Sequence, residues 1–193
     1  VVAVAPDKFY VTNDHGTERG FRRTLEDYGR LPLSYVLYYN GATFAKVCKG
    51  LKYGNGINIS RDGSRLFVAT TTGRELYTYQ RNLEDGSLTP LDNLALKTGL
   101  DNIDVDADGN LWIAAHPKLL AFVGHAKDSM KRSPSQVLML TPSGESYQAE
   151  EVFMDDGSLL SGSSIAIHYK DQLFIGGVFQ PRILRIRLSQ NPK

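Results

Sequence analysis

The sequence predicts an all-β protein, a β-propeller with about four blades in this chain. Three observations support this fold class. A strand–turn–strand unit recurs along the chain, further strand-like segments follow most of these units, and the units are spaced by roughly 45–60 residues. We assign residues 1–193 to a single, partial propeller domain, a length that suffices for one well-buried core. An ordinary β-sandwich is the alternative, and the repeat disfavours it.

The recurring unit is a β-hairpin, seen most clearly at residues 100–116. Apolar residues alternate from Ile103 to Val105, Asp108-Gly109 marks a tight turn, and an apolar strand follows. Three further segments have the same form, with Asp62-Gly63, Lys170-Asp171 and Pro6-Asp7 at their turns: 56–71, 164–178 and 1–14.

Additional strands follow each hairpin and complete the predicted blades. They are expected at residues 34–40, 44–50, 76–82, 88–96, 135–142, 149–157 and 182–188. The last unit then has three strands, and the first begins on the strand that would line the channel. Either the final blade is closed from elsewhere, or the chain is part of a larger propeller. Residues 1–11 look like a strand entered midway, so we expect a mature or partial chain.

One insertion, residues 15–33, interrupts the first unit. Phe21, Leu25 and Tyr28 share one helical face, which predicts a short helix near the channel mouth. Such a helix would be a lid or a docking surface, and a plain packing helix is an equal alternative.

Charge and composition limit the partners. The chain has 22 basic and 21 acidic residues and a net charge of +1, which indicates no nucleic-acid partner. No apolar run approaches the ~20 residues needed to cross a bilayer. The single cysteine, Cys48, excludes an internal disulfide and leaves the compartment undetermined.

Polar residues gather at one predicted rim. In each blade the first strand lines the channel and the second strand runs antiparallel to it. The first residues of the first strand and the last residues of the second strand therefore lie at the same rim of the propeller. The residues at these positions are Asn13, Asp14, Asn55, Thr70, Thr71, Asp101, Asn102, His116, Ser163, Ser164 and Val178.

Convergent Asn and Asp side chains supply the oxygen ligands that Ca²⁺ prefers. The four histidines and one cysteine show no zinc-ligand spacing. The alternative is that these Asn and Asp residues cap strand ends and turns. His116 is a candidate catalytic base or, alternatively, a strand-end histidine bonded to backbone; the sequence identifies no carboxylate partner for it.

Several segments together resemble the serum paraoxonase/arylesterase family: "YVTNDH", "SYVLYY", "GNGINIS", "LDNIDVD", "LWIAAHP" and "GSSIA" followed by "LFIGGVF". The family consists of six-bladed propellers that hydrolyse lactones and aryl esters. The resemblance runs over essentially the whole chain and matches about the C-terminal two thirds of the family's propeller.

The resemblance implies a set of site residues. It assigns Asn13, Asn55, Asp101 and Asn102 to a catalytic Ca²⁺ and Asp14 to a second, structural Ca²⁺. The positions matching or neighbouring the substrate cavity are Tyr35, Tyr53, His116, Ser164 and Val178. The family's remaining calcium ligands, a Glu-Asp pair, and its His-His general-base dyad come from its N-terminal part. An N-terminal fragment or a second chain is therefore expected to complete the propeller.

The implied function is calcium-dependent hydrolysis of lactones and aryl esters, in which Ca²⁺ polarises the carbonyl and stabilises the oxyanion. Asn55, Asp101 and Asn102 are the expected catalytic residues, with Asp101 as the candidate base. The family also implies an extracellular or membrane-associated protein, with lipid contact through residues 21–28. The alternatives are a sugar lactonase of the related propeller type, a non-catalytic binding or scaffold propeller, and a condensing enzyme of the strictosidine-synthase kind.

Overall fold

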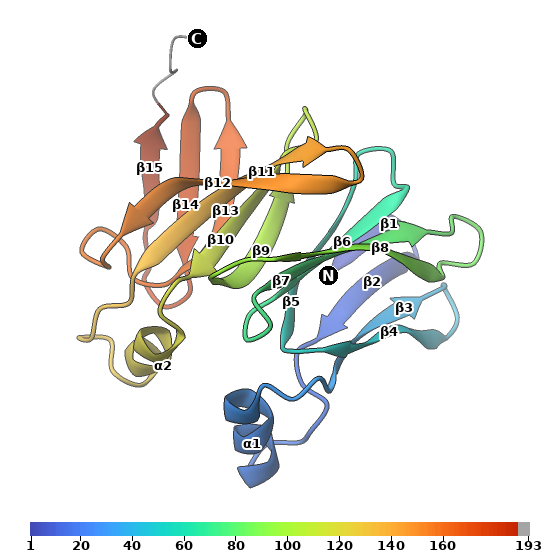
Figure 1. Cartoon of the computed structure of the whole chain (residues 1–193), viewed down its shortest axis with the longest axis horizontal. Helices are drawn as coiled ribbons and strands as arrows, with labels where there is room; N and C mark the ends of the chain where they lie inside the picture. Colours follow the sequence, from blue (N-terminus) through green and yellow to red (C-terminus); the bar gives the residue numbers. More distant parts are fainter. Residues whose placement is uncertain (189–193) are drawn as a thin grey trace.

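A computed structural model of the chain describes residues 1–188 (Figure 1). It contains four antiparallel sheets. The first sheet consists of β1 (Val2–Ala5), β2 (Lys8–Asn13), β3 (Ser34–Tyr39) and β4 (Phe44–Leu51), and the second of β5 (Gly54–Ile59), β6 (Arg65–Thr70), β7 (Glu75–Arg81) and β8 (Leu88–Ala95). The third consists of β9 (Gly99–Val105), β10 (Leu111–His116), β11 (Ser135–Ser143) and β12 (Ser146–Asp155), and the fourth of β13 (Ser163–Tyr169), β14 (Gln172–Gly177) and β15 (Ile183–Arg187).

Strands follow one another in spatial order within every sheet. The first strands of successive sheets also touch: β5 contacts β9, and β9 contacts β13. This arrangement confirms the propeller with about four blades, in which each sheet is a blade and its first strand is innermost. The fourth blade has three strands within the described residues.

The hydrophobic core is divided among the three interfaces between neighbouring blades. Tyr10 and Val36 of the first blade pack with Leu66 of the second, and Phe67 of the second packs with Leu111 of the third. The third interface joins Trp112 and Val137 to Leu173 and Ile175 of the fourth blade. Because strand side chains alternate between the two faces of a sheet, each central blade supplies a core on both sides. A two-sheet sandwich would instead bury one shared core.

Asp-Gly turns close the hairpins at the opposite rim, as the sequence predicts. Gly63 and Gly109 have φ values of 71° and 83°, a left-handed conformation that glycine adopts without a steric penalty. Asp62 accepts hydrogen bonds from the hydroxyls of Ser60 and Ser64, which lower the pKa of its carboxyl to about 2. The turn is therefore fixed by its own side chains.

Two helices, α1 (Phe21–Gly29) and α2 (Leu119–Lys127), project from the same side of the sheets, at the bottom of Figure 1. The first lies in the segment between β2 and β3, where the sequence predicts a helix. Its apolar side chains Phe21, Leu25 and Tyr28 are exposed, so it is not a plain packing helix. The second helix, α2, was not among the elements predicted from the sequence. No helix among residues 1–188 is long and apolar enough to span a bilayer.

Candidate functional site

Strand register places the expected residues at one rim. Gly54 pairs with Thr70, Gly99 with His116, and Ser163 with Gly177. In each case the start of an inner strand lies beside the end of the second strand. The rule used to sort the polar residues from sequence is therefore met in three successive blades.

A β-bulge follows the start of each of these inner strands. In β5 the register shifts between Gly54 and Ile57, so that Asn55 and Gly56 lie in the bulge. The shift in β9 contains Asp101 and Asn102 between Leu100 and Ile103. The shift in β13 contains Ser164 between Ser163 and Ile165. A bulge adds one residue to a strand and re-aims its side chain, and such bulges are common next to active sites. Equivalent bulges thus present the polar residues of three blades to the same place.

Side-chain hydrogen bonds join the blades along this rim. The Thr12 hydroxyl donates to the Asn55 backbone carbonyl at 2.6 Å, which links the first blade to the second. The Asn55 amide donates to the Thr71 hydroxyl at 3.1 Å, and that hydroxyl donates to the Leu100 carbonyl at 2.7 Å. The rim residues therefore hold the first, second and third blades in register.

The third and fourth blades are joined in the same way by Asn102. Its side-chain amide donates to the Asp101 carboxylate at 3.1 Å and to the Ser164 carbonyl and hydroxyl at 3.1 and 3.2 Å. Because the amide nitrogen has these acceptors, the amide group of Asn102 has a fixed orientation.

These residues surround a cleft of about 760 Å³ that lies between α1 and α2. Seven of the sequence-predicted site residues line it: Tyr53, Asn55, Asp101, Asn102, His116, Ser164 and Val178. A volume of this size is typical of a small-molecule site. The bulges supply its polar base, and the helices form its mouth.

Asn13, Asp14 and Tyr35 do not line this cleft. The Tyr35 ring instead lies beneath the Lys46 ammonium, 3.6 Å from its centroid, between β3 and β4. The Asn13 side-chain amide donates to the His15 carbonyl. Asn13 nevertheless lies close to the second blade, because its backbone carbonyl accepts a hydrogen bond from the Ser34 hydroxyl, which in turn accepts one from the Gly54 N–H.

His116 has a carboxylate partner that the sequence did not identify. Its Nε2 lies 3.2 Å from Asp101 Oδ2, and the two residues are 1 % and 6 % exposed. The imidazole also stacks on Phe122 of α2, with ring centroids 3.8 Å apart. When Nε2 donates to Asp101, Nδ1 is the acceptor nitrogen, and it is buried without a hydrogen-bond partner among residues 1–188. A histidine held by a carboxylate in this way is the arrangement of a general acid–base pair.

The wall supplied by α2 is the part of the site that the sequence analysis missed. Leu119, Leu120, Phe122 and Val123 line the cleft from this helix. Their spacing of three and four residues is the helical signal that could have revealed it. Gly162, with a φ of 68°, leaves room for Phe122, because a Cβ there would lie 3.1 Å from the ring.

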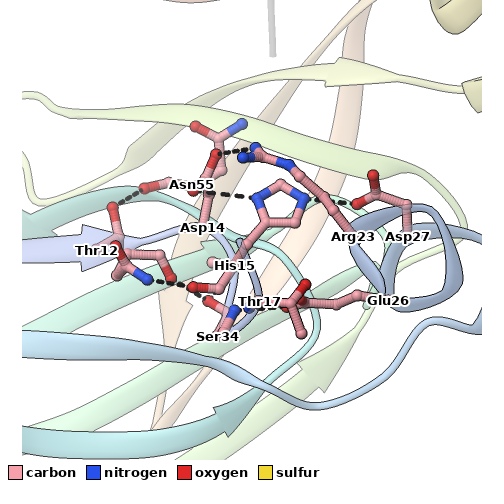
Figure 2. A network of polar contacts seen from close by, with 12 residues as sticks. Thr12, Asp14, His15, Thr17, Arg23, Glu26, Asp27, Ser34 and Asn55 are labelled. Atoms are coloured by element: carbon pink, nitrogen blue, oxygen red, sulfur yellow. Dashed lines mark hydrogen bonds and ion pairs between the residues drawn. The ribbon is translucent and has the colours of Figure 1, made fainter. Parts of the chain in front are cut away.

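The loop that leads into α1 carries a network of polar contacts around the buried His15 (Figure 2). His15, 5 % exposed, lies between two carboxylates: its Nδ1 is 3.1 Å from Asp14 and its Nε2 is 2.6 Å from Asp27 of the helix. Arg23 of the same helix donates to Asp14 at 3.3 Å. Polar contacts of side chains, rather than apolar burial, therefore fasten α1 to the first blade.

Glu26 is the second anchor of α1. Its carboxylate accepts hydrogen bonds from the backbone N–H groups of Gly16 and Thr17 at 2.7 and 2.9 Å, and from the Thr17 hydroxyl at 2.6 Å. Burial raises the pKa of this carboxyl, but the three hydrogen bonds outweigh burial and hold the pKa below its ordinary value. Glu26 is therefore ionised in the folded protein at neutral pH.

The cleft residues fit Ca²⁺ in kind but supply only part of its coordination. Asp101, Asn55 and Asn102 offer carboxylate and amide oxygens, whereas Ca²⁺ takes about six to eight oxygen ligands. Among residues 1–188, no three His, Cys, Asp or Glu side chains are grouped to hold a metal ion. Asp14, which the resemblance assigns to a second Ca²⁺, has a half-exposed carboxylate that lies 3.3 Å from the Arg23 guanidinium and 3.1 Å from His15 Nδ1.

Fold and cleft together define a class: a β-propeller with a polar site at one end of its inner strands, beneath a helical mouth. The Arylesterase family model matches residues 1–186, and the chain belongs to this family. It is 36 % identical over 184 residues to human serum paraoxonase/arylesterase 1, across 93 % of this chain and 50 % of that protein. The corresponding rat serum paraoxonase/arylesterase 2 is 34 % identical over 185 residues, across 93 % of this chain and 51 % of the relative. The chain thus spans about half the length of the curated relatives it matches.

Solved structures support the fold independently. A gluconolactonase from Xanthomonas campestris has a TM-score of 0.53 at 19 % identity, with 81 % of this chain and 45 % of that chain covered. A putative 6-phosphogluconolactonase from Bacteroides fragilis has a TM-score of 0.56 at 8 % identity, with 100 % and 51 % covered. At these identities the likeness establishes the shared propeller fold alone.

Proposed function

We propose that this protein is a calcium-dependent hydrolase of lactones and aryl esters. The observation that carries the proposal is the convergence of Asn55, Asp101 and Asn102, in equivalent bulges, on a cleft that His116 also lines. Membership of the arylesterase family supports the reaction class. The apolar α2 wall favours aryl or acyl-chain substrates over sugar lactones.

Asn55, Asp101 and Asn102 are the residues of the cleft that would hold the ion, and Asn13 is a fourth ligand implied by the resemblance. When bound, Ca²⁺ supplies Lewis-acid polarisation of an ester carbonyl and offsets the negative charge that develops on its oxygen. The hydrogen bonds from Asn102 to Asp101 and Ser164 fix the orientation of its own side chain before the substrate arrives.

The pair Asp101–His116 handles the proton in this proposal. The Asp101 carboxylate holds the imidazole in place, because its Oδ2 lies 3.2 Å from Nε2, and the remaining nitrogen, Nδ1, is the atom that would accept a proton from attacking water. Phe122 covers the imidazole and limits the access of bulk water. Asp101 therefore has two proposed roles, as a calcium ligand and as the partner of His116.

We further propose that additional blades, carried by an N-terminal segment or a second chain, complete a six-bladed propeller and the calcium ligands. Two outer sheet faces support this. On the first blade, Phe9, Tyr39 and Phe44 form an aromatic cluster on the face turned away from the second blade. On the fourth blade, Ile167 and Ile183 are 46 % and 72 % exposed. Such apolar sheet faces are normally covered. The intact mass of the native protein, or a co-purifying chain, tests this directly.

The test of activity compares phenyl acetate, an acyl lactone and a sugar lactone with calcium present and after chelation by EGTA. We expect hydrolysis of the first two, loss of that hydrolysis in EGTA, and its loss in Asn55→Ala and Asp101→Ala variants that still fold. Activity that survives both substitutions or exhaustive chelation contradicts the proposal. Preference for the sugar lactone indicates the related lactonase type, and metal binding without turnover indicates a binding propeller. An extracellular or membrane-associated location remains part of the proposal and follows from the serum relatives.

A further inference from the structure

Three basic residues stand around the mouth of the cleft. Arg30 directly follows α1, Arg74 follows β6, and Lys127 ends α2, and all three line the cleft. None of the ion pairs formed within residues 1–188 involves any of them. Their positive charges are therefore available to a ligand.

The two arginines converge on the turn between β6 and β7. The Arg30 guanidinium donates to the backbone carbonyls of Thr72 and Gly73 at 2.7 and 3.3 Å, while Arg74 directly follows Gly73. Arg74 Nη1 reaches the Lys97 carbonyl only at 3.5 Å, and its Nε is buried without a hydrogen-bond partner in the described chain. Neutral carbonyls orient both guanidinium groups and leave their charge uncompensated. Guanidinium donors suit a carboxylate or another oxyanion.

Apolar side chains line the cleft together with the cations. Leu120 and Val123 of α2 are 76 % and 36 % exposed, and Tyr28 of α1 is 63 % exposed, although all three line the cleft. Phe122 continues this wall inward to His116. A ligand that suits the whole cleft therefore has an apolar chain and a negatively charged end at the mouth.

We propose that the cleft binds amphiphilic anions, with the chain against α2 and the anionic end near Arg30, Arg74 and Lys127. The inference rests on the proposed function for its substrate class: esters and lactones whose acyl chain carries a distal negative charge. The cations line a concave cleft rather than a flat face, which favours a single small amphiphile over a charged membrane surface.

Calorimetry with decanoate and decanol tests the proposal. Both ligands are used as monomers, with EGTA present, so that no metal ion binds the carboxylate. We expect decanoate to bind about tenfold more tightly than decanol, and the difference to disappear at high salt. Arg30→Gln and Arg74→Gln should each weaken decanoate binding about threefold and leave decanol binding unchanged. Two independent variants guard against a local loss of structure.

Arg187→Gln is the matched control, because Arg187 lies on β15, pairs with Asp171 and does not line the cleft. It should bind both ligands as the wild type does. Equal binding of decanoate and decanol by the wild type overturns the proposal, as does unchanged decanoate binding in both cleft variants. Binding to phosphatidylserine vesicles without binding to decanoate also overturns it and indicates a membrane surface. The calorimetry measures binding alone and needs neither turnover nor calcium. Anion binding can therefore be observed even if the protein proves not to be a hydrolase, so the failures of the two proposals are distinguishable.

Discussion

Asp101 and His116 form a buried pair, with Asp101 Oδ2 and His116 Nε2 3.2 Å apart. They come from the neighbouring strands β9 and β10, and the bulge in β9 brings the carboxylate against the imidazole. Of the two carboxylates among residues 1–188 that line the cleft, Asp101 belongs to an inner strand, whereas Asp27 lies on α1 and contacts His15. One side chain thus connects the proposed ion site with the proposed base.

Asp101→Asn tests the charge of this residue rather than its shape. The amide nearly matches the carboxylate in size, so we expect the fold and the melting temperature to be retained. Hydrolysis should fall at least about a hundredfold, because the variant lacks the negative charge that attracts Ca²⁺ and balances His116. Ester hydrolysis and calcium titration check this together. Full activity with an intact calcium affinity would contradict both roles of Asp101.

Phe122 should act as a positioning residue for His116. Its ring lies 3.8 Å from the imidazole, with an angle of 23° between the planes, and its other neighbour is Phe179 at 5.9 Å. In Phe122→Ala the imidazole can turn and water can enter, so kcat should fall roughly ten- to hundredfold while calcium affinity stays constant. A change in KM alone would indicate that Phe122 only contacts substrate. Phe179→Ala, which removes a ring 49 % exposed, is the control and should change kcat little.

Much of the fold was accessible from the sequence because its signals are local. Alternating apolar residues and Asp-Gly turns specify the hairpins, and the antiparallel rule then places Asn55 and Asp101 on one rim. The contact between Asp101 and His116 could not be foreseen, because it depends on a bulge that shifts the register by one residue. The second helix was missed because Gly124 lies in its interior and it begins without a capping side chain at Lys118.

Gly56 lies at the contact between the second and third blades, where we expect any side chain to destabilise the protein. A Cβ at this position would lie 2.3 Å from the Asp101 carbonyl oxygen and 2.9 Å from Asn102 Cα, both backbone atoms that cannot move independently. Gly56→Ala should therefore lower the free energy of unfolding by about 1–3 kcal/mol and weaken the ion site with it. Chemical denaturation checks the first effect and calcium titration the second. In Gly124→Ala, where the nearest atom is a Lys131 side-chain carbon at 3.8 Å, stability should be unchanged or rise.

Glu26 should make the docking of α1 depend on pH. Its pKa is lower in the folded protein than its ordinary value of about 4.5, so its contribution to stability is complete above about pH 4.5. That contribution is lost as the pH falls through the folded pKa. Glu26→Gln should therefore melt at a lower temperature than the wild type at pH 7, and the difference should shrink toward pH 3. Glu18→Gln, at an exposed position before the helix, should behave as the wild type does. A constant difference at every pH would show that the charge of Glu26 is not what anchors the helix.

The exposed apolar face of α1 predicts lipid contact through residues 21–28. Phe21, Leu25 and Tyr28 are 76 %, 49 % and 63 % exposed, and they project from a helix that is held to the protein by its polar side. Transfer of such side chains into a bilayer interface is favourable, so the protein should bind lipid vesicles, and Phe21→Asp should reduce that binding. Leu83→Asp is the matched control, because Leu83 is 62 % exposed in the turn that follows β7. Equal vesicle binding by the wild type and Phe21→Asp would assign this face to something other than lipid. Comparable losses in both variants would reflect added negative charge rather than the position of Phe21.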